Sequence, residues 1–186
     1  MTHRIVVCGP PREGKKALLQ ALARHAVSSS ALQVSETPTG AYRASMMLTF
    51  RDLGVVAFET IHGPAFYLEQ EIKTVFATPA AVVIYVLRQR DPEGRYTTTA
   101  RECEQEYLSW YSSASRAAAS DWNDVPWLWV KMITYRGSDA VAAWGTDGIP
   151  DEILRDTITI DLVKGIGVAT LFTAVEAALG RVAVQP

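Results

Sequence analysis

The chain has few cysteines and little net charge. Its 186 residues include two cysteines, Cys8 and Cys103, which form neither a CxxC pair nor a cluster with histidine. This spacing gives no pattern for a zinc site or a redox motif, so we expect buried or incidental thiols in a reducing cytosol. The formal net charge of −2 gives no electrostatic reason to expect nucleic acid or an anionic membrane as a partner.

The sequence also lacks a long apolar run. No segment reaches the length needed to span a bilayer, and the N-terminus lacks the apolar core of a signal peptide. The last four residues, Ala183-Val184-Gln185-Pro186, carry no lipidation signal. The sequence therefore predicts a cytoplasmic protein without direct membrane insertion. With 48% hydrophobic residues, residues 1–186 have the size and composition of a single globular domain.

What the sequence does contain is a phosphate-binding pattern near its start. Residues 4–8, Arg-Ile-Val-Val-Cys, predict a short apolar strand that runs through a glycine-bounded loop into a helix. The pattern G-x-x-x-x-G-K-[ST] is met at Gly9, Gly14 and Lys15, but Lys16 replaces the final hydroxyl residue. The predicted phosphate-binding residues of this segment are Gly9, Arg12, Glu13, Gly14, Lys15, Lys16 and Ala17.

Lys16 changes what this loop can bind. The two glycines let backbone N–H groups curl around an anion at the positive end of the following helix, and Lys15 is expected to reach the outer phosphates. In an intact loop the Ser or Thr hydroxyl helps to hold Mg²⁺. A protonated lysine cannot ligate a metal, so we predict no metal site. Two interpretations stay open: the Lys16 ammonium sits near the magnesium position as a fixed cation, or it swings to solvent.

Apolar periodicity predicts alternating strands and helices along the rest of the chain. After the first strand, further strands are expected over 44–50, 55–60, 80–87, 125–133 and 157–162, and helices over 15–26, 65–77, 96–119 and 167–179. The turn at 51–54 makes the first two of these strands an antiparallel hairpin. The pattern predicts an α/β fold with a mainly parallel six-stranded sheet, one antiparallel edge strand and helices on both faces.

Residues 28–42 are expected to form a long loop after the first helix, because they contain Ser, Thr, Pro and Gly with little periodicity. Long loops at such positions are often functional. Thr37 and Thr39 are its candidate ligands for a phosphate or a metal. The alternative interpretation is that both are turn residues flanking Pro38.

The order of these elements resembles the Ras-like small GTPase superfamily, a three-layer P-loop fold. Within it the chain most resembles the bacterial MglA-type GTPases, which control cell polarity and motility. Those proteins carry Thr-x-x-Gly-Gln-x-Phe-Tyr where most small GTPases have Asp-x-x-Gly, and residues 60–67 read Thr-Ile-His-Gly-Pro-Ala-Phe-Tyr. Residues 164–171, Lys-Gly-Ile-Gly-Val-Ala-Thr-Leu, look like the last motif and helix of the family.

The chain departs from this pattern at the catalytic positions. The resemblance places Gly63 where a backbone N–H contacts the terminal phosphate, but Pro64 replaces the Gln that orients water and has no polar side chain to do so. His62 is either a substitute or a surface histidine without a catalytic role. Arg43 lies in the region from which an MglA-type protein offers an arginine to transition-state charge, but the loop alignment does not fix its role. No catalytic residue is predicted.

The base-reading motifs are also altered. The resemblance places Asn-Lys-x-Asp within residues 130–135, which contain neither Asn nor Asp in either register. In the last motif the Leu162 N–H is placed to meet a base, but Asp161 beside a purine carbonyl does not help. Losing a buried bidentate contact of this kind costs roughly several kcal/mol of discrimination.

These departures lead to a hypothesis of function by resemblance. The chain is interpreted as a degenerate MglA-like GTPase homologue, a pseudo-GTPase that binds GTP or GDP weakly or not at all and acts as a regulatory or scaffolding module. Its partner surface would include residues 28–43 and 63–77, and a roadblock-type regulator is the implied partner. The alternative is a divergent active NTPase whose partner supplies catalytic groups. A third hypothesis is a binder of another nucleotide or anion.

Overall fold

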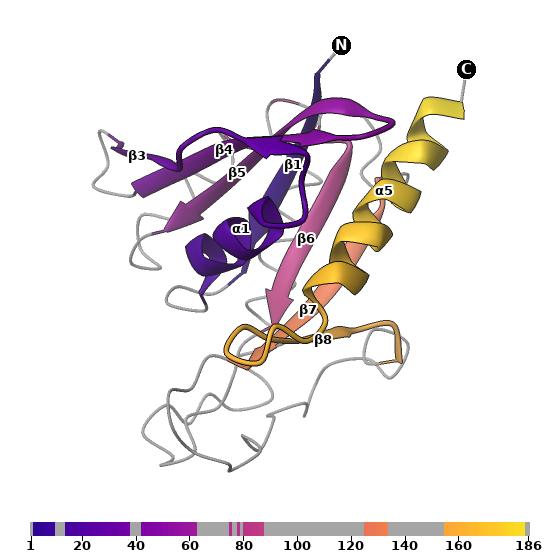
Figure 1. The fold of residues 1–186 in the computed structure, drawn as a ribbon. Coiled ribbons are helices and arrows are strands. Elements are labelled where there is room, and N and C mark those ends of the chain that lie inside the picture. The colour runs from indigo at the N-terminus through magenta and orange to yellow at the C-terminus, as the bar shows by residue number, and fades with distance from the viewer. Residues whose placement is uncertain are drawn as a thin grey trace, which may run out of the picture.

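The computed structural model describes residues 2–9, 14–37, 42–62, 75, 78, 80–87, 125–133 and 155–184. Within them the chain forms an α/β fold built on a curled sheet (Figure 1). The elements in chain order are β1 (His3–Cys8), α1 (Lys15–Ala23), β2 (Ser28–Ser29), β3 (Gln33–Glu36), β4 (Tyr42–Phe50), β5 (Gly54–His62), β6 (Val82–Leu87), β7 (Trp127–Ile133), β8 (Ile158–Asp161) and α5 (Val168–Val184). The helices expected over 65–77 and 96–119 lie outside the described residues, apart from Val75.

The strands form one eight-stranded sheet in the order β2-β4-β5-β1-β6-β7-β8, with β3 also paired to β4. β1 pairs in parallel with β5 and β6, and the parallel pairing continues through β7 to β8. β4 is antiparallel to β5, so the expected hairpin is confirmed. The described sheet is therefore mainly parallel, as the sequence predicted, but the antiparallel strand β4 is not an edge strand, because β2 and β3 pair along its outer side.

The predicted number of strands is wrong, because residues 28–36 were expected to be loop. They contain β2 and β3, which both pair antiparallel with β4, placing Ser28 opposite Thr49 and Gln33 opposite Ser45. The physical reason is the length of β4, whose outer edge would otherwise present unpaired backbone groups. All residues of both short strands are exposed, so they carry none of the apolar alternation that identifies a half-buried strand.

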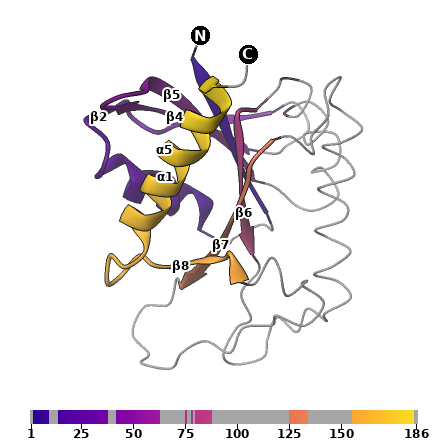
Figure 2. The ribbon, with the colours of Figure 1, turned by 90° about the vertical axis from the view of Figure 1, so that its right-hand side faces the viewer.

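The two described helices lie on one face of the sheet (Figure 2). The helix predicted over 15–26 is confirmed as α1, and the closing helix as α5. Apolar side chains from α1 and α5 form one core cluster with the sheet residues beneath them. In β5 this face carries Val56 and Phe58, both fully buried. All six residues of β6 are buried, which confirms a central strand covered on both faces.

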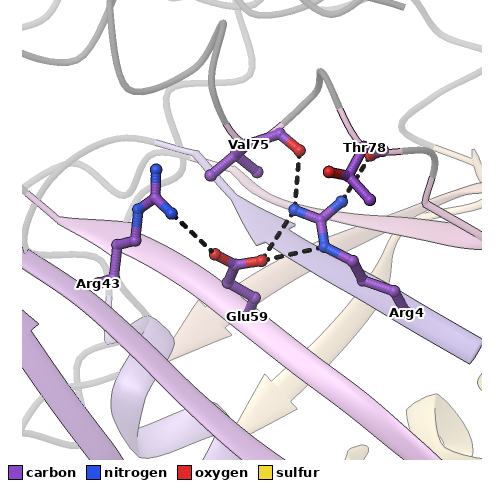
Figure 3. Close-up of polar contacts among 5 residues, drawn as sticks. All are labelled: Arg4, Arg43, Glu59, Val75 and Thr78. Atoms are coloured by element: carbon purple, nitrogen blue, oxygen red, sulfur yellow. Dashed lines mark hydrogen bonds and ion pairs between the residues drawn. The ribbon is translucent and has the colours of Figure 1, made fainter. Parts of the chain in front are cut away.

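The opposite face carries an ion-pair network around Glu59 of β5 (Figure 3). Arg4 of β1 donates from Nε and Nη2 to Glu59 Oε2, at 3.0 and 2.8 Å. The same guanidinium donates to the carbonyl oxygens of Val75 and Thr78, each at 2.7 Å. Arg43 of β4 approaches the other carboxylate oxygen of Glu59 at 3.8 Å. Arg4 therefore ties the residues before β6 to the face of the sheet that α1 does not cover.

In the part of the chain that the structure describes, no helix is long and apolar enough to cross a bilayer.

Candidate phosphate site

The candidate site lies where β1 ends and α1 begins. The carboxyl ends of β1, β5, β6, β7 and β8 share one edge of the sheet, because these strands run in parallel. From β1 the chain continues into α1 on one face, whereas the residues that lead into β6 are held by Arg4 on the other. Connections that leave on opposite faces create a topological switch point, the place where open α/β sheets bind ligands.

Both glycines of the loop are required by its geometry. Gly9 has φ 124°, and a Cβ built on it would collide with the carbonyl oxygen of Val86 in β6. Gly14 has φ 75° and ψ 17° at the N-cap of α1, a left-handed conformation that L side chains rarely adopt. Its carbonyl accepts the first helical hydrogen bond, from Leu18 N at 2.9 Å. The structure therefore explains both glycines of the pattern by close backbone approach and by turn conformation.

Lys15 connects the two ends of the loop. Its side chain is 1% exposed, and Nζ donates to the carbonyl oxygen of Gly9 at 2.9 Å. Burial raises the pKa of the neighbouring Cys8 thiol far above its ordinary value, while the Lys15 charge acts in the opposite direction. Cys8 is therefore a protonated core residue, as expected, and not a nucleophile at neutral pH. Lys15 is therefore a buried cation at the site.

Lys16 is half-buried, and its Nζ lies 6.0 Å from the centroid of the Tyr42 ring. That distance is at the outer limit of a cation–π contact. Tyr42 begins β4, and it pairs with His62 at the carboxyl end of β5. The Lys16 ammonium therefore lies beside an exposed aromatic ring at this edge of the sheet.

Thr60 is a buried polar residue beside this site that sequence reasoning did not predict as a site residue. It lies in β5 opposite Val7 of β1 and Ala44 of β4, and it is fully buried. Its side chain shares the α1 face with Phe58, two residues earlier in the strand. Thr60 Oγ1 has no hydrogen-bond partner in the structure as described. The available signal was the Thr-x-x-Gly motif that begins at Thr60, which the resemblance aligns with the Asp-x-x-Gly of most small GTPases.

The residues at this edge do not fit the magnesium ion that the resemblance implies. Mg²⁺ binds through carboxylates, hydroxyls, waters and phosphates in octahedral geometry. The loop has Lys16 in place of a hydroxyl, and the described residues include no group of three His, Cys, Asp or Glu side chains that could hold a metal. A protein-held metal is therefore not part of the site that we describe.

The remaining predicted residues fall into two groups. Ala17 is exposed on α1, Thr37 directly follows β3, and Leu162 follows β8 and packs partly against the core. Arg12, Glu13, Thr39 and Gly63 lie outside the described residues, so their predicted roles remain predictions. The described part of the chain brings together Gly9, Gly14, Lys15 and Lys16, and it adds Thr60.

Two residues considered for base or charge recognition have structural partners. Asp161 Oδ1 accepts hydrogen bonds from the backbone N–H groups of Val163, at 3.0 Å, and Lys164, at 2.9 Å. Its carboxylate therefore stabilises the turn after β8. Arg43 lies on the face of the sheet opposite α1, paired with Glu59 (Figure 3).

Comparison of the sequence with models of known protein families and with curated proteins finds no match.

Proposed function

We propose that this chain is a degenerate Ras-like, MglA-type GTPase homologue with a three-layer fold. It keeps a phosphate loop, binds GTP or GDP at most weakly, does not hydrolyse GTP efficiently, and acts as a regulatory or scaffolding protein-interaction module. Two features support the proposal. One is the resemblance seen in the sequence, and the other is the parallel sheet with a topological switch point at the end of β1.

The observation that carries the proposal is the contact between Lys15 Nζ and the Gly9 carbonyl oxygen at 2.9 Å. It joins the first and last parts of a glycine-bounded loop, with the lysine charge at the start of a helix. Helix N-termini and inward-facing loop amides favour phosphate groups. The replaced magnesium hydroxyl at Lys16 and the proline at position 64 support a loss of catalysis.

Nucleotide content and turnover test the catalytic part of the proposal. We expect protein purified under native conditions to release no stoichiometric nucleotide, and multiple-turnover phosphate release from GTP to equal that of Lys15→Ala. Stoichiometric GTP or GDP, together with turnover that Lys15→Ala abolishes, would instead establish an active NTPase.

The proposed interaction surface includes the edge formed by β2 and β3. Every residue of β3 is exposed, including the apolar Val34, and the outer side of β3 pairs with no described strand. Such edges are templates for pairing with another chain. We expect Val34→Asp to weaken binding of a roadblock-type protein in a titration without lowering the melting temperature. Undiminished binding by this variant would remove β3 from the proposed surface.

A further inference from the structure

The first turn of α1 has an unusual distribution of charge. Lys15 and Lys16 occupy its first two positions, and the turn contains no acidic residue. The start of a helix carries the positive end of its dipole, so cations there are unfavourable. Most helices place Asp or Glu at these positions. The α1 start is therefore arranged for an anion that comes from outside the helix.

Thr60 gives independent support for a ligand. A buried hydroxyl without a partner is costly, and native structures pair almost all such groups. The side chain lies on the α1 face at the edge where the loop leaves β1, between Val7 on one neighbouring strand and the small Ala44 on the other. The side chain therefore lies on the α1 face near this edge, and its Oγ1 has no hydrogen-bond partner in the structure as described.

Lys16 places a positive charge at the position where an intact loop has the magnesium-binding hydroxyl. Its ammonium lies at the same edge, against Tyr42, at the end of β4 that adjoins the last residues of β5. Among the described residues no carboxylate forms an ion pair with Lys16. In a loop with a hydroxyl at this position, Mg²⁺ neutralises two neighbouring phosphates. A lysine here places a fixed positive charge in the protein itself.

We propose that the start of α1 binds the phosphate chain of a nucleoside diphosphate or triphosphate without a divalent cation. The Lys16 ammonium supplies the charge that a metal would carry, and the Thr60 hydroxyl donates to a phosphate oxygen. The inference rests on the proposed function, because it requires the phosphate loop around Lys15. It adds that phosphate binding by this chain does not require magnesium, unlike phosphate binding by a loop that has the Ser or Thr hydroxyl.

The experiment is a calorimetric titration of the full chain with GDP, GTP, ATP and inorganic tripolyphosphate, in EDTA and in excess magnesium chloride. We expect the affinity in EDTA to equal or exceed that in magnesium. Lys16→Thr restores the hydroxyl of the ordinary pattern, and we expect it to weaken binding in EDTA about tenfold and to make binding magnesium-dependent. Equal binding of tripolyphosphate and nucleotides would show that the phosphate chain alone is recognised.

Two matched variants sharpen this test. Arg24→Ala removes a positive charge from an exposed position at the other end of α1, and we expect it to leave the affinity unchanged. Thr60→Val keeps the shape of the side chain and removes the donor, and we expect a loss of severalfold in EDTA. Circular dichroism checks that each variant is folded.

The outcomes separate the two proposals. Binding that requires magnesium in the wild type, or that Lys16→Thr leaves unchanged in EDTA, overturns the further inference and leaves the phosphate loop intact. Binding that is absent under both conditions, with Lys15→Ala indistinguishable from the wild type, overturns the further inference and agrees with a proposed function in which the chain binds no nucleotide. Binding in EDTA that falls in Lys16→Thr and Thr60→Val but not in Arg24→Ala supports both.

Discussion

Glu59 and Thr60 are consecutive residues of β5, and they show how the two faces of the sheet treat a polar group. Glu59 accepts two hydrogen bonds from Arg4 and lies 3.8 Å from Arg43 (Figure 3). Thr60, on the α1 face, is fully buried, and its hydroxyl has no hydrogen-bond partner in the structure as described. The Glu59 carboxylate is therefore hydrogen-bonded within the protein, whereas the Thr60 hydroxyl on the α1 face has no partner among the described residues.

The Arg4–Glu59 network and the Thr60 hydroxyl contribute differently to the stability of the fold. The Arg4 guanidinium joins β1, β5 and the backbone before β6, so its hydrogen bonds hold the sheet to its next connection. A satisfied network of this kind stabilises the fold and offers no group to a ligand. The Thr60 hydroxyl has no such partner in the structure as described, and the further inference assigns it to a ligand for that reason.

The largest effect is expected where the α1 face is most constrained, at Gly9. Gly9→Ala places a Cβ against the Val86 carbonyl oxygen at a φ of 124°, so we expect it to lower the free energy of unfolding by about 3 kcal/mol and to abolish phosphate binding. Urea denaturation measures the first effect, and titration of the folded variant measures the second.

Gly54→Ala is the matched control for Gly9→Ala. Gly54 has φ 72° in the β4–β5 turn, and a Cβ there meets no atom within 4 Å. Only the conformational cost of about 1 kcal/mol remains. Equal losses of stability in the two alanine variants would contradict the close approach between the loop and β6.

Substitutions in the ion-pair network around Glu59 test whether the two faces of the sheet have separate roles. Glu59→Gln removes the charge that faces Arg4, and we expect a loss of about 1–2 kcal/mol in the free energy of unfolding, because both side chains are largely buried. Arg43→Gln should cost at most about 0.5 kcal/mol, since its contact is longer and more exposed. Neither change should alter phosphate binding, because both side chains lie on the other face. Weaker phosphate binding by Glu59→Gln would show that the ion-pair network affects the site on the other face, and it would contradict this prediction.

Thr60→Val is expected to have a smaller effect on stability, with the opposite sign. Replacing an unsatisfied buried hydroxyl by a methyl group should raise the free energy of unfolding by about 1 kcal/mol when no anion is present. A melting curve in phosphate-free buffer measures this gain. If the valine variant is less stable than the wild type, the hydroxyl is satisfied in solution and the contrast with Glu59 fails.

The sequence predicted most of the described sheet because its strands are apolar and its breaks carry clear turn residues. The six buried residues of β6 and the Gly54 turn are the clearest cases. β2 and β3 could not be predicted in the same way, because their stability comes from backbone pairing with β4 and their side chains are exposed. Periodicity detects buried faces, and these strands have none.

The candidate site was predicted at its glycines and at Lys15, where the chemistry follows from a local pattern. The motif drew attention to Thr60, but its burial on the α1 face could not be predicted, because it depends on which strand pairs with β1 and on which face the side chain lies. The position of Lys16 was left between two alternatives for a similar reason. Tyr42, the aromatic residue beside it, is distant in sequence and reaches it only through the antiparallel edge.

The smallest expected effect concerns Lys131 of β7, which contrasts with Lys15. The side chain is half-buried, and burial lowers its pKa from the ordinary value of 10.5. Between the lowered pKa and 10.5 the unfolded chain binds more protons than the folded one, so the wild type gains stability as the pH rises through this window. Below the window the cost of the buried charge is fully present. We therefore expect Lys131→Met to be slightly more stable than the wild type at pH 7, with the difference shrinking toward pH 10.5. Urea denaturation of both proteins across this range measures the difference, and a gap that stays constant with pH would show that Lys131 is not desolvated.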